Sequence, residues 1–150
     1  PDVIWRARGA NAEINRNAER DAQAFTPESA PTLASLRALL AESAVALPEG
    51  LPPMAAGVFG YMGYDTVRQI ERLPEMTPDA LGVPDAIMIR PTLMAIFDSV
   101  KDEMTIATPV RPASGVGARE AYDAALKRLH TLVARLDDEP APPASRESSA

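Results

Sequence analysis

An apolar and aromatic stretch in the middle of the chain carries three glycines at a strict spacing of three: Gly57, Gly60 and Gly63. The apolar run and the periodic residues after it predict a buried strand that turns into a short helix, Thr66 to Arg72, with Asp65 capping its first turn. Glycine inside a strand costs stability unless a neighbouring backbone or side chain needs the space above it. We therefore expect a strand that is buried on both faces and closely approached at its glycines.

A glycine-rich loop ahead of a helix can also bind phosphate, because the helix N-terminus offers backbone N–H groups to anions. This stretch contains neither Gly-Lys-Ser/Thr nor Gly-x-Gly-x-x-Gly. Its predicted helix opens with the carboxylate of Asp65, which repels an anion. Gly60 and Gly63 are therefore predicted to serve packing and not ligand contact.

Composition narrows the functional classes. A chain of 150 residues with 46% hydrophobic content suffices for one domain with a modest core. Its formal net charge of -6 argues against nucleic acid and anionic membranes as partners, because both need a basic patch. The absence of cysteine excludes disulfides, thiol nucleophiles and thiolate metal sites. No run approaches the roughly 18 apolar residues of a membrane span and no signal-peptide pattern is present, so we expect a soluble cytoplasmic protein.

Alternating apolar and polar residues predict two antiparallel hairpins. They are expected over residues 2–8 with 12–16, and over residues 92–98 with 103–108. The first should bury Val3, Trp5 and Ala7 on one face. Between the hairpins, a strand over residues 84–91 is expected to be interrupted at Pro91, because proline cannot donate to a sheet ladder. Residues 17–31 are polar and weakly periodic, and we predict a loop there.

Two stretches with helical periodicity are predicted as amphipathic helices. The first begins with Thr32 as its N-cap, runs to about Ala46 and presents an apolar stripe: Leu33, Leu36, Leu40 and Ala44. The second spans Ala118 to Leu136, with Asp123 and Lys127 able to pair on its polar side. Together with the strands, these helices predict an α+β domain.

No pattern in the sequence predicts a catalytic, ligand-binding or metal site. His130, the single histidine, has no second ligand at i+4 or i-4, so a surface or half-buried helix position is expected. The acidic pairs lie in a predicted turn, Asp102 with Glu103, and in the C-terminal tail, where solvent keeps both members ionised. No Gly-x-Ser-x-Gly occurs. The tail, residues 137–150, lacks large apolar side chains and is predicted to be a flexible linker.

Four blocks of the sequence carry a family resemblance: Pro1–Gly9 with Ala12–Arg16, Phe59–Arg68, Leu81–Thr92 and Phe97–Val110. In the same order, they resemble blocks of bacterial anthranilate synthase component I, the chorismate-using subunit of tryptophan biosynthesis. The second block, which begins Phe59-Gly60-Tyr61-Met62-Gly63-Tyr64-Asp65, is similar to Phe-Gly-Tyr-Leu-Gly-Tyr-Asp in that family's N-terminal domain. The resemblance implies antiparallel β-sheets or a sandwich flanked by helices, packed against a larger chorismate-binding domain.

The resemblance carries no catalytic or ligand-binding residue onto this chain. The family's Leu-Leu-Glu-Ser motif, which contributes to the feedback tryptophan site, is expected before Pro1, and the Asn-Pro-Ser-Pro-Tyr-Met segment that completes that site is missing. The catalytic histidine and the magnesium-binding glutamates are expected in a domain after Ala150. Only structural motif positions transfer: Gly60, Tyr61, Gly63, Tyr64 and Asp65.

These departures imply an internal piece of component I. Residues 1–136 would be an incomplete N-terminal domain, structural or regulatory and inactive alone, and residues 137–150 the linker to a catalytic domain. The parent would convert chorismate and ammonia or glutamine to anthranilate and pyruvate, with Mg²⁺ and a glutamine amidotransferase subunit, while this segment binds no cofactor. Two alternatives stay open. One is the N-terminal domain of aminodeoxychorismate synthase component I, of folate synthesis; the other is a free-standing, non-catalytic binding module.

Overall fold

The computed structural model describes residues 1–74, 79, 81–111 and 115–137 of the chain. It divides into two compact units, residues 1–109 and residues 110–150, each of which is described by itself. The predicted α+β class is confirmed, because antiparallel sheets and helices make up the described residues. Within these residues, no helix combines the length and the apolar character that crossing a membrane requires.

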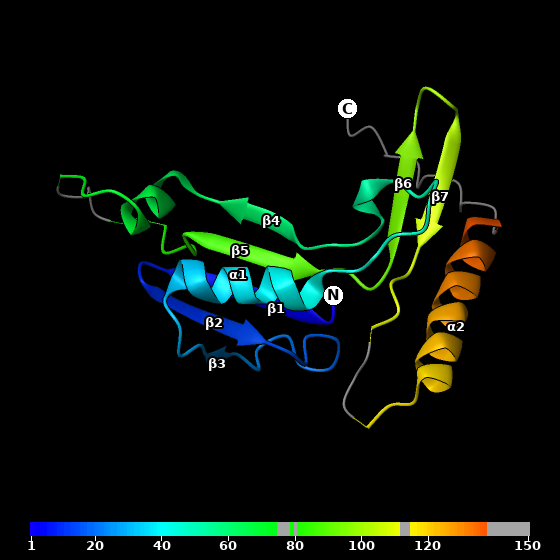
Figure 1. The fold of residues 1–150 in the computed structure, drawn as a ribbon, viewed down its shortest axis with the longest axis horizontal. Helices are drawn as coiled ribbons and strands as arrows, with labels where there is room; N and C mark the ends of the chain where they lie inside the picture. Colours follow the sequence, from blue (N-terminus) through cyan, green and yellow to red (C-terminus); the bar gives the residue numbers. More distant parts are fainter. Residues whose placement is uncertain (75–78, 80, 112–114, 138–150) are drawn as a thin grey trace, which may run out of the picture. The chain divides into compact units, whose positions relative to one another are not determined.

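The first unit is built on a five-stranded antiparallel sheet with the strand order β3-β2-β1-β5-β4 (Figure 1). Its strands are β1 Val3–Arg8, β2 Asn11–Asn15, β3 Thr26–Pro27, β4 Phe59–Met62 and β5 Ala86–Arg90. Because β1 lies in the middle, it pairs with its neighbour in sequence, β2, and with β5, about eighty residues further on. Strands β3 and β4 form the two edges of the sheet.

The predicted first hairpin is confirmed as the β1–β2 pair. Gly9 closes its tight turn at a φ of 52°, a left-handed conformation that favours glycine. Val3, Trp5 and Ala7 are all buried, as the alternation predicted. The loop predicted over residues 17–31 is correct except at the two residues of β3, which pair with β2.

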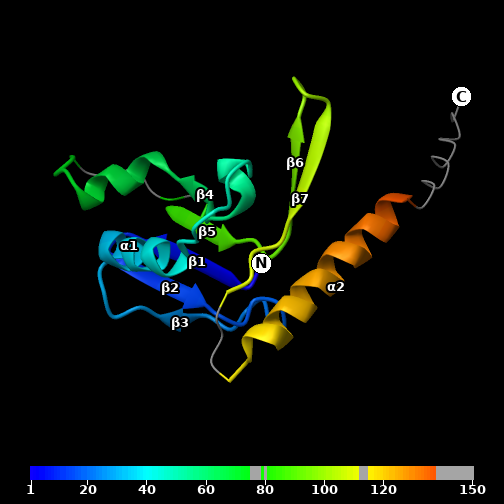
Figure 2. The same cartoon turned by 45° about the vertical axis from the view of Figure 1, so that its right-hand side comes forward.

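The helix α1, Thr32–Ser43, lies along one face of the sheet in both ribbon views (Figures 1 and 2). Its Leu36 and Leu39 join Trp5 and its neighbours in one buried cluster. The Trp5 indole Nε1 donates a hydrogen bond to Ser35 Oγ at 2.9 Å, and Ser35 Oγ in turn donates to Glu28 Oε2 at 3.0 Å. The only tryptophan of the chain is thus tied to the helix that covers it.

Two details of the α1 prediction were wrong. Thr32 is not the N-cap but lies inside the helix, after Pro31, and its Oγ1 donates to the Gly9 carbonyl at 2.7 Å. The buried face is also displaced from the predicted stripe, leaving Leu40 and Ala44 exposed: it consists of Thr32, Ser35, Leu36, Leu39 and Ser43. A hydroxyl group can be buried in a core when it has a hydrogen-bond partner there. A prediction based on apolar residues alone does not include such buried serine and threonine positions.

The predicted second hairpin is confirmed as β6, Met94–Asp98, paired with β7, Glu103–Ala107. It forms a separate two-stranded sheet beyond Pro91, which ends β5 as predicted. Within the same unit, β6 contacts a short 3-10 helix, η1 Pro53–Ala55. In the hairpin turn, Asp98 Oδ1 accepts hydrogen bonds from the backbone N–H groups of Val100 and Lys101.

The described part of the second unit contains one long helix, α2 Ala118–Asp137, which confirms the predicted helix. The Asp123 carboxylate pairs with Arg119, one turn earlier, at 3.1 Å, instead of with Lys127. Asp137 still belongs to α2, and the rest of the predicted linker, residues 138–150, lies outside the described residues. The extent of the predicted domain, residues 1–136, stays a prediction.

The contact between Trp5 and Ser35 predicts a stability effect. Ser35→Ala should lower the free energy of unfolding by about 1–3 kcal/mol, because the buried indole N–H loses its acceptor. Ser29→Ala, at an exposed serine, should change it by less than about 0.5 kcal/mol. Urea unfolding followed by the fluorescence of the single tryptophan measures both. A Ser35→Ala midpoint equal to the parent's would contradict the assigned role.

The hairpin turn predicts a titration. Backbone hydrogen bonds from Lys101 and then Val100 lower the pKa of Asp98 below its ordinary value of 3.8. The stabilisation that the ionised Asp98 carboxylate gives the turn is therefore complete above the ordinary pKa of an aspartate. It is lost as the pH falls through the lowered pKa of Asp98 in the folded chain. The amide chemical shifts of Val100 and Lys101 should titrate with a midpoint below 3.8, and Asp98→Asn should abolish that titration. A midpoint at or above 3.8 would show that these hydrogen bonds do not form.

Candidate functional site

The glycine motif of the sequence is centred on β4, with Gly57 before the strand, Gly60 on it and Gly63 directly after it. Gly60 is paired with Met88, and Tyr61 with Ile87, on the adjacent strand β5. A Cβ built on Gly60 would lie 2.8 Å from the carbonyl carbon of Ile87 and 2.9 Å from Met88 Cα, and it would be closer still to the Ile87 carbonyl oxygen. Cβ atoms do not approach backbone so closely, so this geometry requires glycine.

The expectation that this strand is buried on both faces was wrong. Gly60, Tyr61 and Met62 are exposed and Phe59 is half-buried. The physical reason is that β4 lies at the edge of the sheet, whereas α1 packs over β1 and β2. An apolar run in a sequence does not distinguish an edge strand from a central one. The glycine at position 60 reflects a close approach within the sheet plane, not burial between two layers.

Gly63 and the residues around it are tied to the start of β5. The Gly63 N–H donates to the Asp85 carbonyl at 2.7 Å, and a Cβ at Gly63 would lie 3.1 Å from that oxygen. The Tyr61 hydroxyl donates to the Pro84 carbonyl at 2.8 Å, and Thr66 Oγ1 donates to the Asp85 carbonyl at 3.3 Å. These contacts fix the end of β4 against the segment that enters β5.

Asp65 does not cap a helix, which corrects the prediction. The helix at this point is a 3-10 helix, η2 Tyr64–Gln69, with Gly63 in the N-cap position. Asp65 therefore falls in the first turn, where its Oδ1 accepts a hydrogen bond from Arg68 Nε at 2.9 Å. Since a 3-10 helix has three residues per turn, side chains three apart stand one above the other, which suits this ion pair. Tyr64, the remaining motif residue, is 85% exposed.

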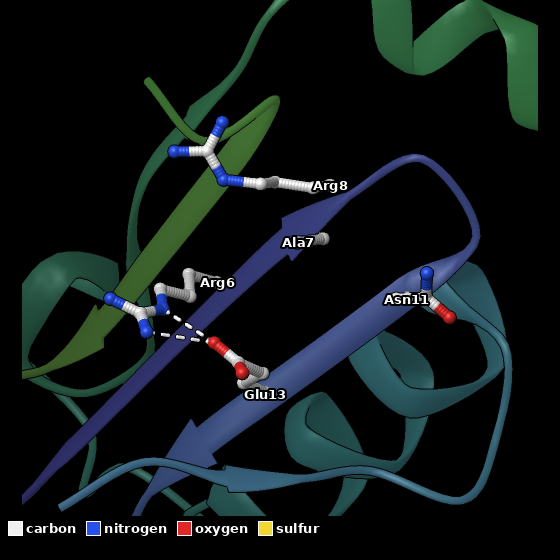
Figure 3. A pocket seen from close by; sticks show the side chains of 5 residues that line it. All are labelled: Arg6, Ala7, Arg8, Asn11 and Glu13. Atoms are coloured by element: carbon white, nitrogen blue, oxygen red, sulfur yellow. Dashed lines mark hydrogen bonds and ion pairs between the residues drawn. The ribbon is translucent and has the colours of Figure 1, made fainter. Parts of the chain in front are cut away.

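A cavity of about 370 Å³ opens on the β1–β2 hairpin, lined by Arg6, Ala7, Arg8, Asn11 and Glu13 (Figure 3). The hairpin register builds it, because Arg6 stands opposite Glu13, and Arg8 opposite Asn11. This cavity was not predicted from the sequence. The alternation of polar residues along both arms of the hairpin was the available signal, but only the register brings the two arms together.

Both guanidinium groups of this cavity already have partners. Arg6 Nη2 lies 2.8 Å from Glu13 Oε2 (Figure 3). The Arg6 guanidinium carbon lies 3.7 Å from the centre of the Phe25 ring. Arg8 donates to the carbonyl oxygens of Val83 and Gly82. The cavity is therefore polar, but its charged side chains already have partners within the chain. It presents no nucleophile with an adjacent base.

The remaining chemical candidates belong to other elements of the chain. His130 is exposed on α2. Asp102 and Glu103 are exposed at the β6–β7 turn, where Asp102 has a φ of 54°. Across the described ranges, no three His, Cys, Asp or Glu side chains gather where they could hold a metal ion. Mg²⁺ is held in proteins by carboxylate oxygens together with water and substrate oxygens, and the described residues hold no group of three such side chains for it.

Comparison with known proteins shows which proteins this chain is similar to. The sequence is 48% identical over 147 residues to anthranilate synthase component 1 of Cereibacter sphaeroides, a match that covers 98% of this chain and 29% of that protein. The chain is homologous to anthranilate synthase component I. A second relative of that name, from Mycolicibacterium smegmatis, is 34% identical over 141 residues, covering 88% of this chain and 27% of its own. The chain thus spans less than a third of the length of these curated relatives. No protein-family model matches it.

A solved structure shows the same fold. The crystal structure of anthranilate synthase component I from Streptococcus pneumoniae superimposes with a TM-score of 0.64 at 17% sequence identity. The superposition covers 95% of this chain and 28% of that one. The family resemblance and the fold class predicted from the sequence are therefore both confirmed. The structural roles of Gly60, Tyr61, Gly63, Tyr64 and Asp65 stay predictions that mutation can test.

The close approach at Gly60 predicts a large loss of stability on substitution. Gly60→Val should lower the free energy of unfolding by about 3 kcal/mol or more, because its side chain would overlap the β5 backbone. Two controls should each cost less than about 1 kcal/mol: Gly117→Val, since a Cβ there meets no atom within 4 Å, and His130→Ala at an exposed position. Thermal melts compare the three variants. A Gly60→Val protein that melts like the parent would show that β4 can move away from β5 at no cost.

Proposed function

We propose that this chain is part of the N-terminal domain of an anthranilate synthase component I and that its role there is structural or regulatory, not catalytic. The observation that carries the proposal is the 48% identity that extends over 98% of the chain. A match that includes nearly every element favours a shared role over a similarity of fold alone. The parent enzyme, a lyase, would convert chorismate and ammonia or glutamine to anthranilate and pyruvate.

The rest of the parent enzyme would supply the chemistry. The proposal places chorismate and Mg²⁺ in a chorismate-binding domain outside this chain and assigns ammonia delivery to a glutamine amidotransferase subunit. The parent would act in tryptophan biosynthesis in the cytoplasm. This chain spans 29% and 27% of the length of the two relatives. Most of the sequence of those proteins therefore remains for such a domain.

The side-chain chemistry of the described residues supports a non-catalytic role. A general acid and base need environments that move their pKa values toward neutrality. The Arg16 pKa is raised, chiefly by its side-chain hydrogen bond to Glu42, and the Asp98 pKa is lowered by backbone hydrogen bonds in an exposed turn. Both shifts move these groups away from neutrality. The first shift reflects a stabilised ion pair and the second a stabilised turn. Neither brings a group closer to the pKa that proton transfer requires.

The relatives compared above carry the anthranilate synthase name, which favours this branch over aminodeoxychorismate synthase component I. A free-standing binding module is less well supported, because in the cavity on the β1–β2 hairpin the charge of Arg6 is already balanced by its ion pair with Glu13.

A chimera tests the proposal. Replacing the matched region of the Cereibacter sphaeroides protein with this chain should give an enzyme that forms anthranilate from chorismate, Mg²⁺ and ammonium within about tenfold of the parent rate, since an intact supporting domain costs little transition-state stabilisation. The chain alone should form none under the same conditions. Anthranilate fluorescence measures both. Product from the chain alone would refute the non-catalytic role, and a folded but inactive chimera would refute the family role.

A further inference from the structure

The strand β4 leaves one edge of the five-stranded sheet open. It pairs with β5 on one side, and no strand of the described residues lies on its other side (Figure 1). Backbone groups of an antiparallel strand point alternately toward and away from the neighbouring strand. Because the Gly63 N–H points toward β5 and donates to the Asp85 carbonyl, the N–H and C=O groups of Met62 and Gly60 point outward. The edge therefore presents a row of backbone donors and acceptors.

The two edges of this sheet differ in how they are protected against pairing. Natural proteins blunt an edge with charged side chains, with proline or with a very short strand. The edge strand β3 has only two residues, one of which is Pro27, and Glu28 follows it. The edge strand β4 contains neither proline nor charge, and the sequence has no charged residue from Gly50 to Tyr64. An unprotected edge of this kind is a template for another strand.

We propose that two copies of this chain pair through their β4 edges, antiparallel and about a twofold axis at Tyr61. A strand edge is complementary to its own copy under such a rotation, because donors then meet acceptors. With Tyr61 on the axis, Gly60 of one copy stands opposite Met62 of the second copy, and their outward groups exchange hydrogen bonds. The two five-stranded sheets then form one continuous sheet. This dimer goes beyond the proposed function and does not require it, because it depends only on β4 and β5.

The side chains around the axis favour a second copy as the partner. The two Tyr61 residues meet at a non-hydrogen-bonded position, where side chains lie closest, and aromatic cross-strand pairs stabilise a sheet. The Tyr61 hydroxyl already donates to the Pro84 carbonyl, so the ring loses little conformational entropy on pairing. Charged residues begin only at Asp65, beyond the strand, where Arg68 pairs with it. The formal net charge of -6 is thus not carried at the paired edge.

The concentration dependence of the dimer tests the proposal. Sedimentation velocity of the isolated chain between about 10 μM and 1 mM should show a monomer–dimer equilibrium, because one strand pair makes a small interface and hence a weak dimer. Amide hydrogen exchange at Gly60 and Met62 should be slower at the upper concentration by at least about threefold, since both groups become hydrogen-bonded. The Val100 amide, which donates to Asp98 in the β6–β7 turn, is the control and should change by less than about 1.5-fold.

Two matched lysine variants locate the contact. Met62 and Met54 are both exposed, and either change to lysine adds one positive charge to the chain, but Met54 lies on η1, outside β4. Met62→Lys should weaken the dimer at least about tenfold, because it places a charge on the paired edge of each copy. Met54→Lys should change the dissociation constant by less than about twofold, since an exposed charge away from the contact contributes little. Thermal melts followed by circular dichroism check that both variants fold.

Several results would overturn the proposal. A chain that stays monomeric up to about 1 mM does not pair through β4. A dimer that both lysine variants weaken equally, or in which exchange at Gly60 and Met62 is unchanged, makes its contact elsewhere, and the exchange result holds even if Met62→Lys does not fold. Slow exchange of both amides in the monomer would mean that the chain itself covers the edge. Protection of both amides in a monomeric chimera would mean that the rest of the Cereibacter sphaeroides protein covers it.

Discussion

The first unit depends on the burial of Trp5 in the central strand. The residue is fully buried, its strand pairs on both sides, and its indole N–H is bonded to Ser35 on α1. Complete burial of a side chain of this size contributes about 2–3 kcal/mol or more, and the hydrogen bond ensures that no buried donor is left without a partner. The helix, the hairpin and β5 are thereby held in one arrangement. Gly60, Tyr61 and Gly63 of the glycine motif are positioned by β5 and by the segment that enters it.

A charged cluster secures the same arrangement at the opposite end of β5. Arg90 donates to both carboxylate oxygens of Asp2 and lies 3.2 Å from Glu42 at the end of α1, and Glu42 also pairs with Arg16. The Arg90 side chain is only 13% exposed, so these pairs are screened less than surface ion pairs. The cluster joins β1, β5 and α1 immediately before Pro91. The chain then leaves the five-stranded sheet for the β6–β7 hairpin.

Local patterns predicted local structure well, and they failed where the outcome depends on distant partners. The alternation around Trp5 and the periodicity of residues 118–136 led to correct elements, because each pattern reflects a face of a single element. The buried face of α1 was misjudged because the partners of Thr32 and Ser35 lie on the hairpin. The strand containing Gly60 was expected to be buried, whereas its position at the edge follows from the pairing of β1 with β5. The cavity between Arg6 and Glu13 likewise appears only once the register is known.

The family could be predicted because four separated blocks agree in order with one known enzyme subunit, and the 48% identity bears this out. We propose above all that this segment supports a catalytic domain encoded with it. Sequencing the coding region on both sides of the segment tests this most directly. We predict that the reading frame continues beyond residue 150 into a chorismate-binding domain with its catalytic histidine and magnesium-binding glutamates. A stop codon directly after residue 150, with no such domain encoded alongside, would contradict this supporting role.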